Sequence, residues 1–411
     1  MSLKKIKQLF NIEKGVLQSS KCIEGEYDFI TAAADWKTHN EYTHDCEALI
    51  FAAAASGSLG RTHYVNGKFI SSDLCFILTP KEPEKLPVNL RFYHIIFNLY
   101  KNEIVAATKA GTSKEAIGLR VFGEYELPYF DISIQQKVKA EFGKAEALKN
   151  DLFDEYTYQL TLLENLNQAI LQEAVQGKLV PQDPKDEPAS ELLKRIKAEK
   201  ATLRQAQGKG KKEKPLPPIK PEEIPFDIPE NWVWCRLGEI ISISSGDGLT
   251  SYQMDKSGNI PVYGGNGING YHSKFNIDSK RIVIGRVGAY CGAVHITEDK
   301  GWVTDNAFIV SYSVENIDFN WLAFFLKALD LNKLSYKGNQ PVISGARVYP
   351  LVVPLPPLSE QKRIVAEIEK QFALTKQLKE HIIANQQATE QLLKALLHQA
   401  FEVKEMEEVN S

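Results

Sequence analysis

Apolar residues recur with the period of an α-helix over two long stretches of the chain, residues 134–176 and 359–403. Side chains three, four and seven positions apart share one face of a helix, so each stretch is predicted to form one amphipathic helix. Neither stretch contains a proline, which would interrupt the helix. Ser133 and Ser359 precede the two stretches and are the predicted N-caps, since a serine hydroxyl can accept hydrogen bonds from free backbone amides.

The apolar stripe of each predicted helix continues for more turns than a small domain can cover, which favours an antiparallel coiled coil of the two helices. The alternative is that each helix packs only on its own domain. Gln159 and Asn385 fall within the stripe and are expected to fix the register. The residues predicted to line the seam are Val138, Phe142, Leu152, Tyr156, Leu166, Ile170, Ile364, Ile368, Leu378, Ile382, Leu392 and Leu396.

A different pattern precedes each helix, in residues 1–133 and 230–358. Short apolar runs such as Leu49–Ala54 and Ile282–Gly285 lead into turns that contain glycine, asparagine or aspartate. Short strands separated by such turns indicate compact β-rich domains, and Asn320–Leu329 is predicted to be a helix packed on the second domain.

The two halves of the chain repeat one another. Residues 129–142 align with residues 355–368 at a shift of 226, and residues 48–78 align with residues 280–310 at a shift of 232, both without a gap. A repeat of a domain followed by a helix predicts two similar structural units. Identical pairs in these alignments include Ser133/Ser359, Gln135/Gln361, Gly60/Gly292 and His63/His295.

Residues 177–229 separate the two copies and differ from both in composition. Ser190–Lys200 is predicted to form a short helix, and Gly208–Pro218 is rich in lysine and proline. The fold class is therefore α+β, with two β-rich globular domains, each followed by a long helix, in a pseudo-twofold repeat. The predicted order is a first domain (1–133), a helix (134–176), this linker (177–229), a second domain (230–358), a second helix (359–403) and a tail (404–411).

Composition narrows the class of protein. The 411 residues are 43% hydrophobic and 25% charged, which is typical of a soluble protein. No apolar run could span a bilayer and the N-terminal sequence has no signal core, so we expect a cytoplasmic protein without a membrane partner. The five cysteines never show C-x-x-C spacing, which argues against a disulfide framework or a zinc site. A net charge of −3 does not by itself indicate nucleic-acid binding.

Motifs of catalysis are missing from the sequence. Gly265–Gly270 matches G-x-G-x-x-G, but the turn-like residues after it do not begin a helix, as a dinucleotide site requires. The histidines lack metal-binding spacing, and there is no nucleophile elbow, no P-loop and no N-P-P-[YF] motif of an amino-methyltransferase. We therefore predict a binding protein with no catalytic and no metal-binding residues, and not an enzyme.

Two similar domains on antiparallel helices would lie at opposite ends of the helix pair. Ile134–Val175 as one helix would measure roughly 60 Å at about 1.5 Å per residue, more than the ~34–36 Å of one turn of DNA. The domains could therefore contact two half-sites on one face of a duplex. Because the two domains differ in sequence, the two half-sites would differ as well.

The stretches L-P-P-L-S-E-Q-K-R-I, P-E-N-W-x-W-x-R-L-G-E-I and A-I-L-Q-E-A-V-Q-G-K-L-V-P, together with the duplicated plan, resemble the specificity (S) subunit of type I restriction-modification systems. The resemblance covers nearly the whole chain, although the first copy lacks the P-E-N-W-x-W opening. It implies two target-recognition domains, each of which recognises one part of a bipartite DNA sequence, and two conserved helices that space these domains.

The resemblance also implies partners and cofactors. Two modification subunits would dock on the helices, bind S-adenosylmethionine and methylate adenine at N6. Separate restriction subunits would use ATP and Mg to translocate and cut the double-stranded DNA. No cofactor is expected on this chain itself, which would supply discrimination while the modification subunits complete the clamp around DNA.

Polar loops in both domains carry side chains suited to DNA. Arginine pairs with guanine, asparagine and glutamine pair with adenine, and lysine, serine and threonine contact phosphates. The candidate DNA-binding residues are Arg61, Thr62, Lys68, Thr112, Ser113, Lys114, Arg120, Asn266, Asn269, Tyr271, Lys274, Arg286, Lys337, Asn339, Gln340 and Arg347.

The main alternative is a coiled-coil scaffold whose β-rich domains bind proteins and not DNA. Two different sets of polar loops fit such a scaffold less well, because a scaffold has no evident need for them. A methyltransferase or nuclease with a disguised motif is a further alternative, and the missing motifs argue against it.

Overall fold

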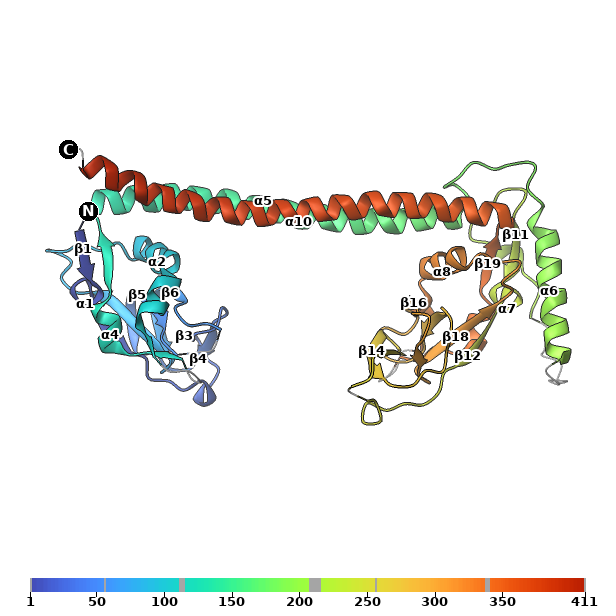
Figure 1. Cartoon of the computed structure of the whole chain (residues 1–411), viewed down its shortest axis with the longest axis horizontal. Helices are drawn as coiled ribbons and strands as arrows, with labels where there is room; N and C mark the ends of the chain where they lie inside the picture. Colours follow the sequence, from blue (N-terminus) through green and yellow to red (C-terminus); the bar gives the residue numbers. More distant parts are fainter. Residues whose placement is uncertain are drawn as a thin grey trace. The chain divides into compact units, whose positions relative to one another are not determined.

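The computed structural model describes residues 2–54, 57–110, 115–206, 216–255, 257–336 and 341–409 (Figure 1). The chain divides into two compact units, Met1–Thr157 with Ile383–Ser411, and Tyr158–Ile382. Each unit holds one β-rich head and a stretch of each long helix, α5 (Ile132–Val175) and α10 (Leu358–Val409). The fold class is α+β, as the sequence predicts.

A six-stranded sheet forms the body of the first head, in the order β2-β7-β5-β6-β3-β4. Alternate residues of β5 enter two separate cores, Leu49 and Phe51 on one face and Ile50 on the other, which explains the unbroken apolar run in this strand. The elements are β1 Ser2–Lys5, α1 Ile6–Leu9, β2 Phe10–Lys14, η1 Ser19–Lys21, β3 Tyr27–Ile30, β4 Lys37–His39, β5 His44–Ala52, β6 Thr62–Ser71, β7 Cys75–Pro80, α2 Leu90–Leu99, α3 Lys101–Thr108, β8 Lys109–Ala110, β9 Ala116–Ile117, α4 Leu119–Glu124 and β10 Glu126–Tyr129.

The second head has its strands in smaller sheets, β12-β18-β15-β16, β14-β13-β17 and β11-β19. Its larger apolar cluster continues into α6, α8 and the adjoining ends of both long helices, and a smaller cluster lies around Val283. The elements are α6 Ala189–Ala206, η2 Pro221–Glu223, β11 Val233–Arg236, α7 Leu237–Ile240, β12 Ile241–Ser245, β13 Ile260–Gly264, β14 Gly267–His272, β15 Ile282–Gly285, β16 Val294–Ile296, β17 Trp302–Val303, β18 Ala307–Tyr312, α8 Phe319–Ala328, η3 Leu331–Leu334, α9 Gly345–Val348 and β19 Val352–Leu355.

The structure confirms the internal repeat. β1, α1 and β2 of the first head coincide with β11, α7 and β12 of the second at a shift of 231 residues, and β7 coincides with β18 at a shift of 232. β10 and β19, which lead into the long helices, coincide at a shift of 226. α2 and α8 have equal lengths and are each capped at the N-terminus by a side chain, Asn89 on the Phe92 amide and Asp318 on the Trp321 amide.

The two long helices run antiparallel within the second unit. Val175 near the end of α5 lies by Ile364 near the start of α10, and Thr375, further along α10, donates a hydrogen bond of 2.8 Å to Asn167. In the first unit the hydroxyls of Tyr156 and Thr389 lie 3.4 Å apart. Polar side chains therefore meet between the helices in both units.

The starts of the two helices differ from the prediction, because Ser133 and Ser359 are not N-caps. Each serine lies inside the first turn, since α5 begins at Ile132 and α10 at Leu358. The backbone carbonyls of Asp131 and Pro357 accept the first hydrogen bonds of these helices. α10 also continues to Val409, beyond its predicted end at residue 403.

The residues predicted to line the seam differ in burial. Ile170, Ile364 and Ile368 are buried, Val138 is buried in the core of the first head, and Phe142, Leu152, Tyr156 and Ile382 are half-buried. Leu166, Leu378, Leu392 and Leu396 are instead 46%, 53%, 60% and 48% exposed. The apolar stripe is wider than the contact between the helices, so spacing alone assigned these four leucines to the wrong side. Gln159 is half-buried and Asn385 is exposed.

One buried glutamine joins each head to its long helix. In the first unit the Gln135 amide donates to Pro87 O and Phe130 O, and its Oε1 accepts from the Asn89 backbone amide at 2.8 Å. In the second unit Gln361 donates to Pro356 O and accepts from the Asp318 amide at 2.9 Å.

Both glutamines are fully buried, and each binds the residue that caps α2 or α8. The identity Gln135/Gln361 in the repeat therefore reflects a shared structural joint.

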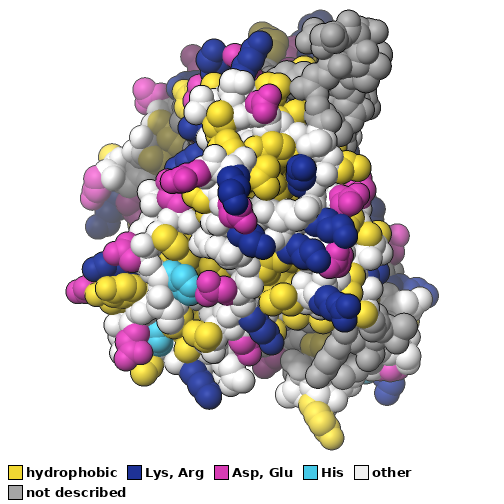
Figure 2. Space-filling view, turned by 90° about the vertical axis from the view of Figure 1, so that its left-hand side faces the viewer, with side chains coloured by type: hydrophobic (Ala, Val, Ile, Leu, Met, Phe, Trp, Pro, Cys, Tyr) yellow, Lys and Arg dark blue, Asp and Glu magenta, His cyan; other side chains and the backbone are white. Residues whose placement is uncertain are grey.

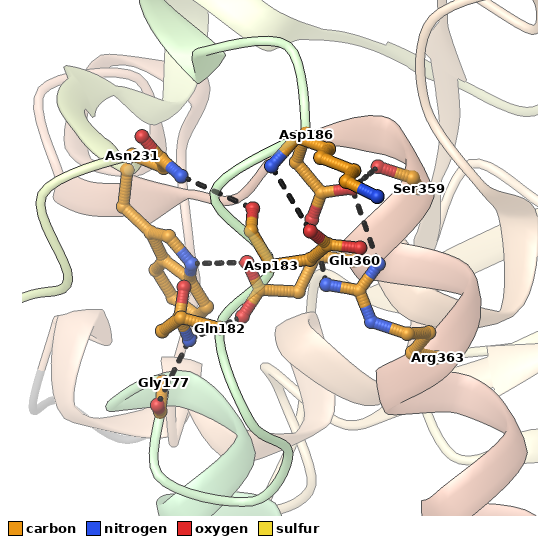
Figure 3. A network of polar contacts seen from close by, with 10 residues as sticks. Gly177, Gln182, Asp183, Asp186, Asn231, Ser359, Glu360 and Arg363 are labelled. Carbon is orange, nitrogen blue, oxygen red and sulfur yellow. Dashed lines mark hydrogen bonds and ion pairs between the residues drawn. The ribbon is translucent and has the colours of Figure 1, made fainter.

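The second unit adds a polar network around the start of α10 (Figure 3). The carboxylate of Glu360 is buried and accepts hydrogen bonds from Trp232 Nε1 at 2.9 Å and from Gln182 Nε2 at 2.7 Å. Burial raises the pKa of the Glu360 carboxyl group. Trp232, Gln182 and Glu360 come from three separate stretches of the sequence, so the W-x-W opening, the linker and the S-E-Q-K-R stretch meet at one place.

A salt bridge completes this network. The Arg363 guanidinium contacts Asp186 at 2.6 Å, and the Ser359 hydroxyl donates to the same carboxylate. Arg363 lowers the pKa of Asp186. The linker is thus fastened to the helix that follows the second head, and the residues that make this junction serve the fold.

The glutamine joint predicts a specific loss of stability. We expect Gln135→Ala to lower the free energy of unfolding of the first unit by about 1–3 kcal/mol, because a buried amide and two carbonyls lose their partner. The neighbouring Gln136 is exposed, so Gln136→Ala should change it by no more than about 0.5 kcal/mol. Urea titration of the purified chain measures both, and equal losses in the two variants would contradict the joint.

Candidate nucleic-acid interface

A polar hollow of about 260 Å³ opens on the surface of the second head. Three segments that are far apart in the sequence form it: the turn between β13 and β14, the turn that follows β15, and the residue before β18. The lining residues are Gly265, Asn266, Asn269, Val287, Gly288, Ala289, Tyr290 and Asn306. Of the predicted residues, Asn266 and Asn269 therefore come together with the Arg286–Tyr290 turn.

Glycines let these segments approach one another. A Cβ on Gly265 would lie 2.3 Å from the Val287 carbonyl oxygen, and a Cβ on Gly285 would lie 2.1 Å from the Gly265 carbonyl oxygen. Gly267 and Gly288 have φ angles of +80° and +98°, which other residues rarely adopt. The glycine-rich sequence thus makes two tight turns whose backbones touch.

The chemistry of the hollow is that of amides. Asn266, Asn269 and Asn306 are exposed, and each amide offers both a donor and an acceptor. An adenine presents one donor and one acceptor on its major-groove edge, which an asparagine can match with two hydrogen bonds. The hollow can therefore bind a nucleobase edge.

Tyr290 lines this hollow, and 62% of its surface is exposed. Its turn is held rigidly, since Cys291 N donates to Gly288 O and the Asn332 side chain donates to Cys291 O. Tyr290 also lines a second cleft, of about 490 Å³, to which Lys327 contributes. Burial lowers the pKa of the Lys327 ammonium group.

Arg286 directly precedes the lining residue Val287 and is not itself among the lining residues of the hollow. Its Nη1 donates to the Ser245 hydroxyl at 3.1 Å and to Asp305 O at 3.4 Å, and its guanidinium lies 5.4 Å from the centre of the Phe308 ring. Its backbone amide donates to Asn306 O. The Arg286 side chain thus joins the end of β12 to the residues just before and within β18.

The other candidates in the second head lie apart from the hollow. Tyr271 and Lys274 are exposed on and after β14. The Arg347 guanidinium lies 3.5 Å from the centre of the Tyr336 ring and donates to Leu334 O. Lys337, Asn339 and Gln340 fall outside the described residues.

In the first head, two of the predicted side chains serve the structure. Arg61 Nη1 donates to Ala32 O at 2.9 Å, and Thr62 is buried with its hydroxyl directed at Gly60 O. Lys68 Nζ lies 4.9 Å from the centre of the Tyr42 ring. Arg120 is exposed on α4, and Thr112, Ser113 and Lys114 fall outside the described residues.

Three findings bear on the kind of site. On the face that Figure 2 presents, Lys and Arg side chains lie among Asp and Glu side chains and do not form one basic patch. Among the described residues, no group of His, Cys, Asp and Glu could hold a metal ion. In the same part of the chain, no helix is long and apolar enough to cross a membrane.

Tyr290 and Asn306 are not among the candidate DNA-binding residues predicted from the sequence. Tyr290 is an aromatic residue between Gly288 and Gly292, and such a tight turn must leave a large ring outside, so this spacing could have indicated it. Asn306 gives no local signal. It joins the hollow only because β18 pairs with β15, which places it beside the turn after β15.

The chain belongs to the family of the type I restriction modification DNA specificity domain, whose family model matches residues 1–162 and 229–385. The two matches fall on the two copies of the repeat. The match thus includes both heads and the greater part of both long helices.

Individual relatives agree with this family. The type I restriction enzyme EcoEI specificity subunit of Escherichia coli is 31% identical over 265 residues, which cover 57% of this chain and 44% of that protein. The EcoAI specificity subunit of E. coli is 64% identical over 84 residues, 20% of this chain and 14% of that protein. The matched segments thus span less than half the length of these two relatives.

A solved structure shares the fold. That structure concerns complex assembly and conformational transition of the type I R-M system. The structural alignment covers 97% of each chain, with a TM-score of 0.56 and a sequence identity of 17%. The duplicated arrangement of heads and helices is therefore a fold already seen in a type I R-M structure.

The close approach of the two turns predicts that one methyl group disturbs the hollow. We expect Gly265→Ala to lower the free energy of unfolding of the second unit by about 1–3 kcal/mol, because its Cβ would collide with the Val287 carbonyl. Gly248→Ala is the matched control, since a Cβ there has no heavy atom within 4 Å. Urea titration compares the two variants, and a neutral Gly265→Ala would show that the turns do not touch.

Proposed function

We propose that the chain is the recognition subunit of a type I restriction-modification complex, and that its two heads bind the two different halves of one bipartite DNA target. The observation that carries this proposal is the pair of heads itself. Their strands and helices coincide element by element, whereas the side chains on their loops differ. One scaffold used twice with different loops suits a target that has two unlike halves.

In the second head the hollow is the proposed base-binding site. The amides of Asn266 and Asn269 can each form two hydrogen bonds with adenine, and Tyr290 offers a ring to an adjacent base. Lys327, in the neighbouring cleft, suits a phosphate contact. Arg286 acts indirectly, because its side chain binds Ser245 and Asp305 next to the hollow.

Partner subunits supply the chemistry. This chain has no catalytic role in the proposal, and the modification subunits bind S-adenosylmethionine and methylate adenine at N6. Restriction subunits use ATP and Mg to translocate and cut the DNA. The complex acts in the cytoplasm, where it meets double-stranded DNA. A net charge of −3 fits a chain that contributes discrimination, while its partners supply most of the attraction to phosphates.

The exposed leucines of the long helices are the proposed docking site for a modification subunit. In the second unit Leu162 and Leu166 lie four residues apart on α5, and Leu374 and Leu378 lie four apart on α10, so each pair shares a face of its helix. All four side chains are between 45% and 53% exposed. Such apolar stripes on a water-soluble complex are typical of protein contacts.

Selection of bound duplexes from random DNA tests the base-binding site. The complex of this chain with its modification subunit should select a two-part sequence with a fixed gap, and Asn269→Ala should relax one part only, by about 1–3 kcal/mol of discrimination. Asn259→Ala, an exposed asparagine outside the hollow, should select the unchanged sequence. If Asn269→Ala selects the same sequence as the parent protein, the hollow does not bind bases.

The affinity of this chain for the modification subunit tests the docking site. Leu374→Ser combined with Leu378→Ser should weaken binding of the modification subunit about tenfold or more, because two apolar side chains no longer enter the interface. Gln377→Ser on the same helix is the control. Isothermal titration measures the dissociation constants. Equal affinity in the parent protein and the double variant would place the interface elsewhere.

A further inference from the structure

The first head carries a hairpin equivalent to the one that forms the hollow of the second. In the first head β3 pairs antiparallel with β4 and parallel with β6, with Tyr27 opposite His39. In the second head β13 pairs antiparallel with β14 and parallel with β17, with Ile260 opposite His272. Both partners of this pair are related by a shift of 233 residues, so the two hairpins occupy the same place.

This equivalence assigns a counterpart to each residue of the hollow's hairpin. At this shift residues 31–36, which join β3 to β4, align with residues 264–269, and Trp36 aligns with Asn269, which lies on β14 next to a bulge in the pairing. Trp36 is 38% exposed. The candidate residues drawn from the sequence of the first head do not include it.

A histidine on the adjoining strand supports the tip in both heads. In the first head His63 Nε2 lies 2.9 Å from Ala33 O, and Trp36 Nε1 donates to His63 Nδ1 at 3.2 Å. In the second head a Cβ on Gly267 would lie 3.2 Å from the ring of His295. His63 and His295 are an identical pair of the repeat, so each tip lies next to an equivalent histidine ring.

The hydrogen bonds of His63 determine what Trp36 can offer to a ligand. An indole N–H can only donate, so His63 Nδ1 accepts and its proton is on Nε2, which donates to Ala33 O. Burial lowers the pKa of His63, in accord with a neutral ring. The one polar atom of the Trp36 side chain is therefore used inside the protein, and its exposed surface is apolar.

We propose that Trp36 is a specificity-determining residue of the first head and that it contacts the C5-methyl group of a thymine in the major groove. This inference rests on the proposed function. The major-groove edges of bases carry donors and acceptors, and an apolar ring against these would leave them unpaired. The thymine methyl is the apolar group on those edges.

The two heads thus discriminate by different chemistry at one equivalent position. Asn269 forms hydrogen bonds with a base in the second head, and Trp36 makes an apolar contact in the first. The half-site of the first head therefore contains at least one A·T pair.

Replacing thymine by uracil removes the methyl group and keeps base pairing. With the complex of full chain and modification subunit, uracil at the thymines of the first half-site should weaken binding of the parent protein about fourfold to tenfold, the effect of one buried methyl group. Trp36→Ala should bind both duplexes with the same affinity. Trp36→Phe keeps an apolar ring and loses the bond to His63, so it should still prefer thymine.

The same titrations separate the ways in which the proposal can fail. A parent complex that is indifferent to uracil, or a Trp36→Ala complex that still prefers thymine, overturns the role of Trp36 alone. Loss of the modification subunit in Trp36→Ala would instead identify a protein contact and also overturn it. A parent complex that does not distinguish its two-part target from scrambled DNA overturns the proposed function, and this inference with it.

Discussion

A buried glutamine side chain joins each head to its long helix, next to the apolar core that the head shares with the start of that helix. Gln135 and Gln361 use both ends of the amide, binding a carbonyl just before the long helix and the amide of the residue that caps α2 or α8. A buried amide that loses these partners has no water to replace them, so the joint is stable only in one geometry. The hairpins at the far side of each head are thereby oriented relative to the start of the helix in the same unit.

Much of this fold could be predicted from the sequence. The spacing of apolar residues predicts the helices and strands, and identical residues at aligned positions reveal the repeat. The unbroken apolar run around Ile50 is predicted as a strand, and it forms a strand buried on both faces. The seam was harder to predict. Leu378 and Thr375 lie three residues apart, and hydrophobicity favours the leucine, yet the threonine is buried against Asn167. A helix with apolar side chains on two faces does not reveal in its spacing which face meets its neighbour.

The candidate site shows the same limit at the level of single side chains. Asn266 and Asn269 could be predicted because polar residues in a glycine-rich turn are exposed. Arg61 and Arg286 have the right chemistry for DNA, but each directs one guanidinium nitrogen at a backbone carbonyl, and no local pattern reveals this. Trp36 has an apolar side chain, which sequence reasoning assigns to a core. Only the pairing of β3 with β4 and β6 shows that it aligns with Asn269 of the second head.

In the proposed function, two equivalent heads recognise two unlike halves of one DNA target. The most direct test is to express this chain together with its modification subunit in a host that lacks DNA methylation, and to map N6-methyladenine over the genome. We expect one two-part motif with a fixed gap, which is present only when both proteins are made. A single continuous motif, or no methylation despite a stable complex of the two proteins, would contradict it.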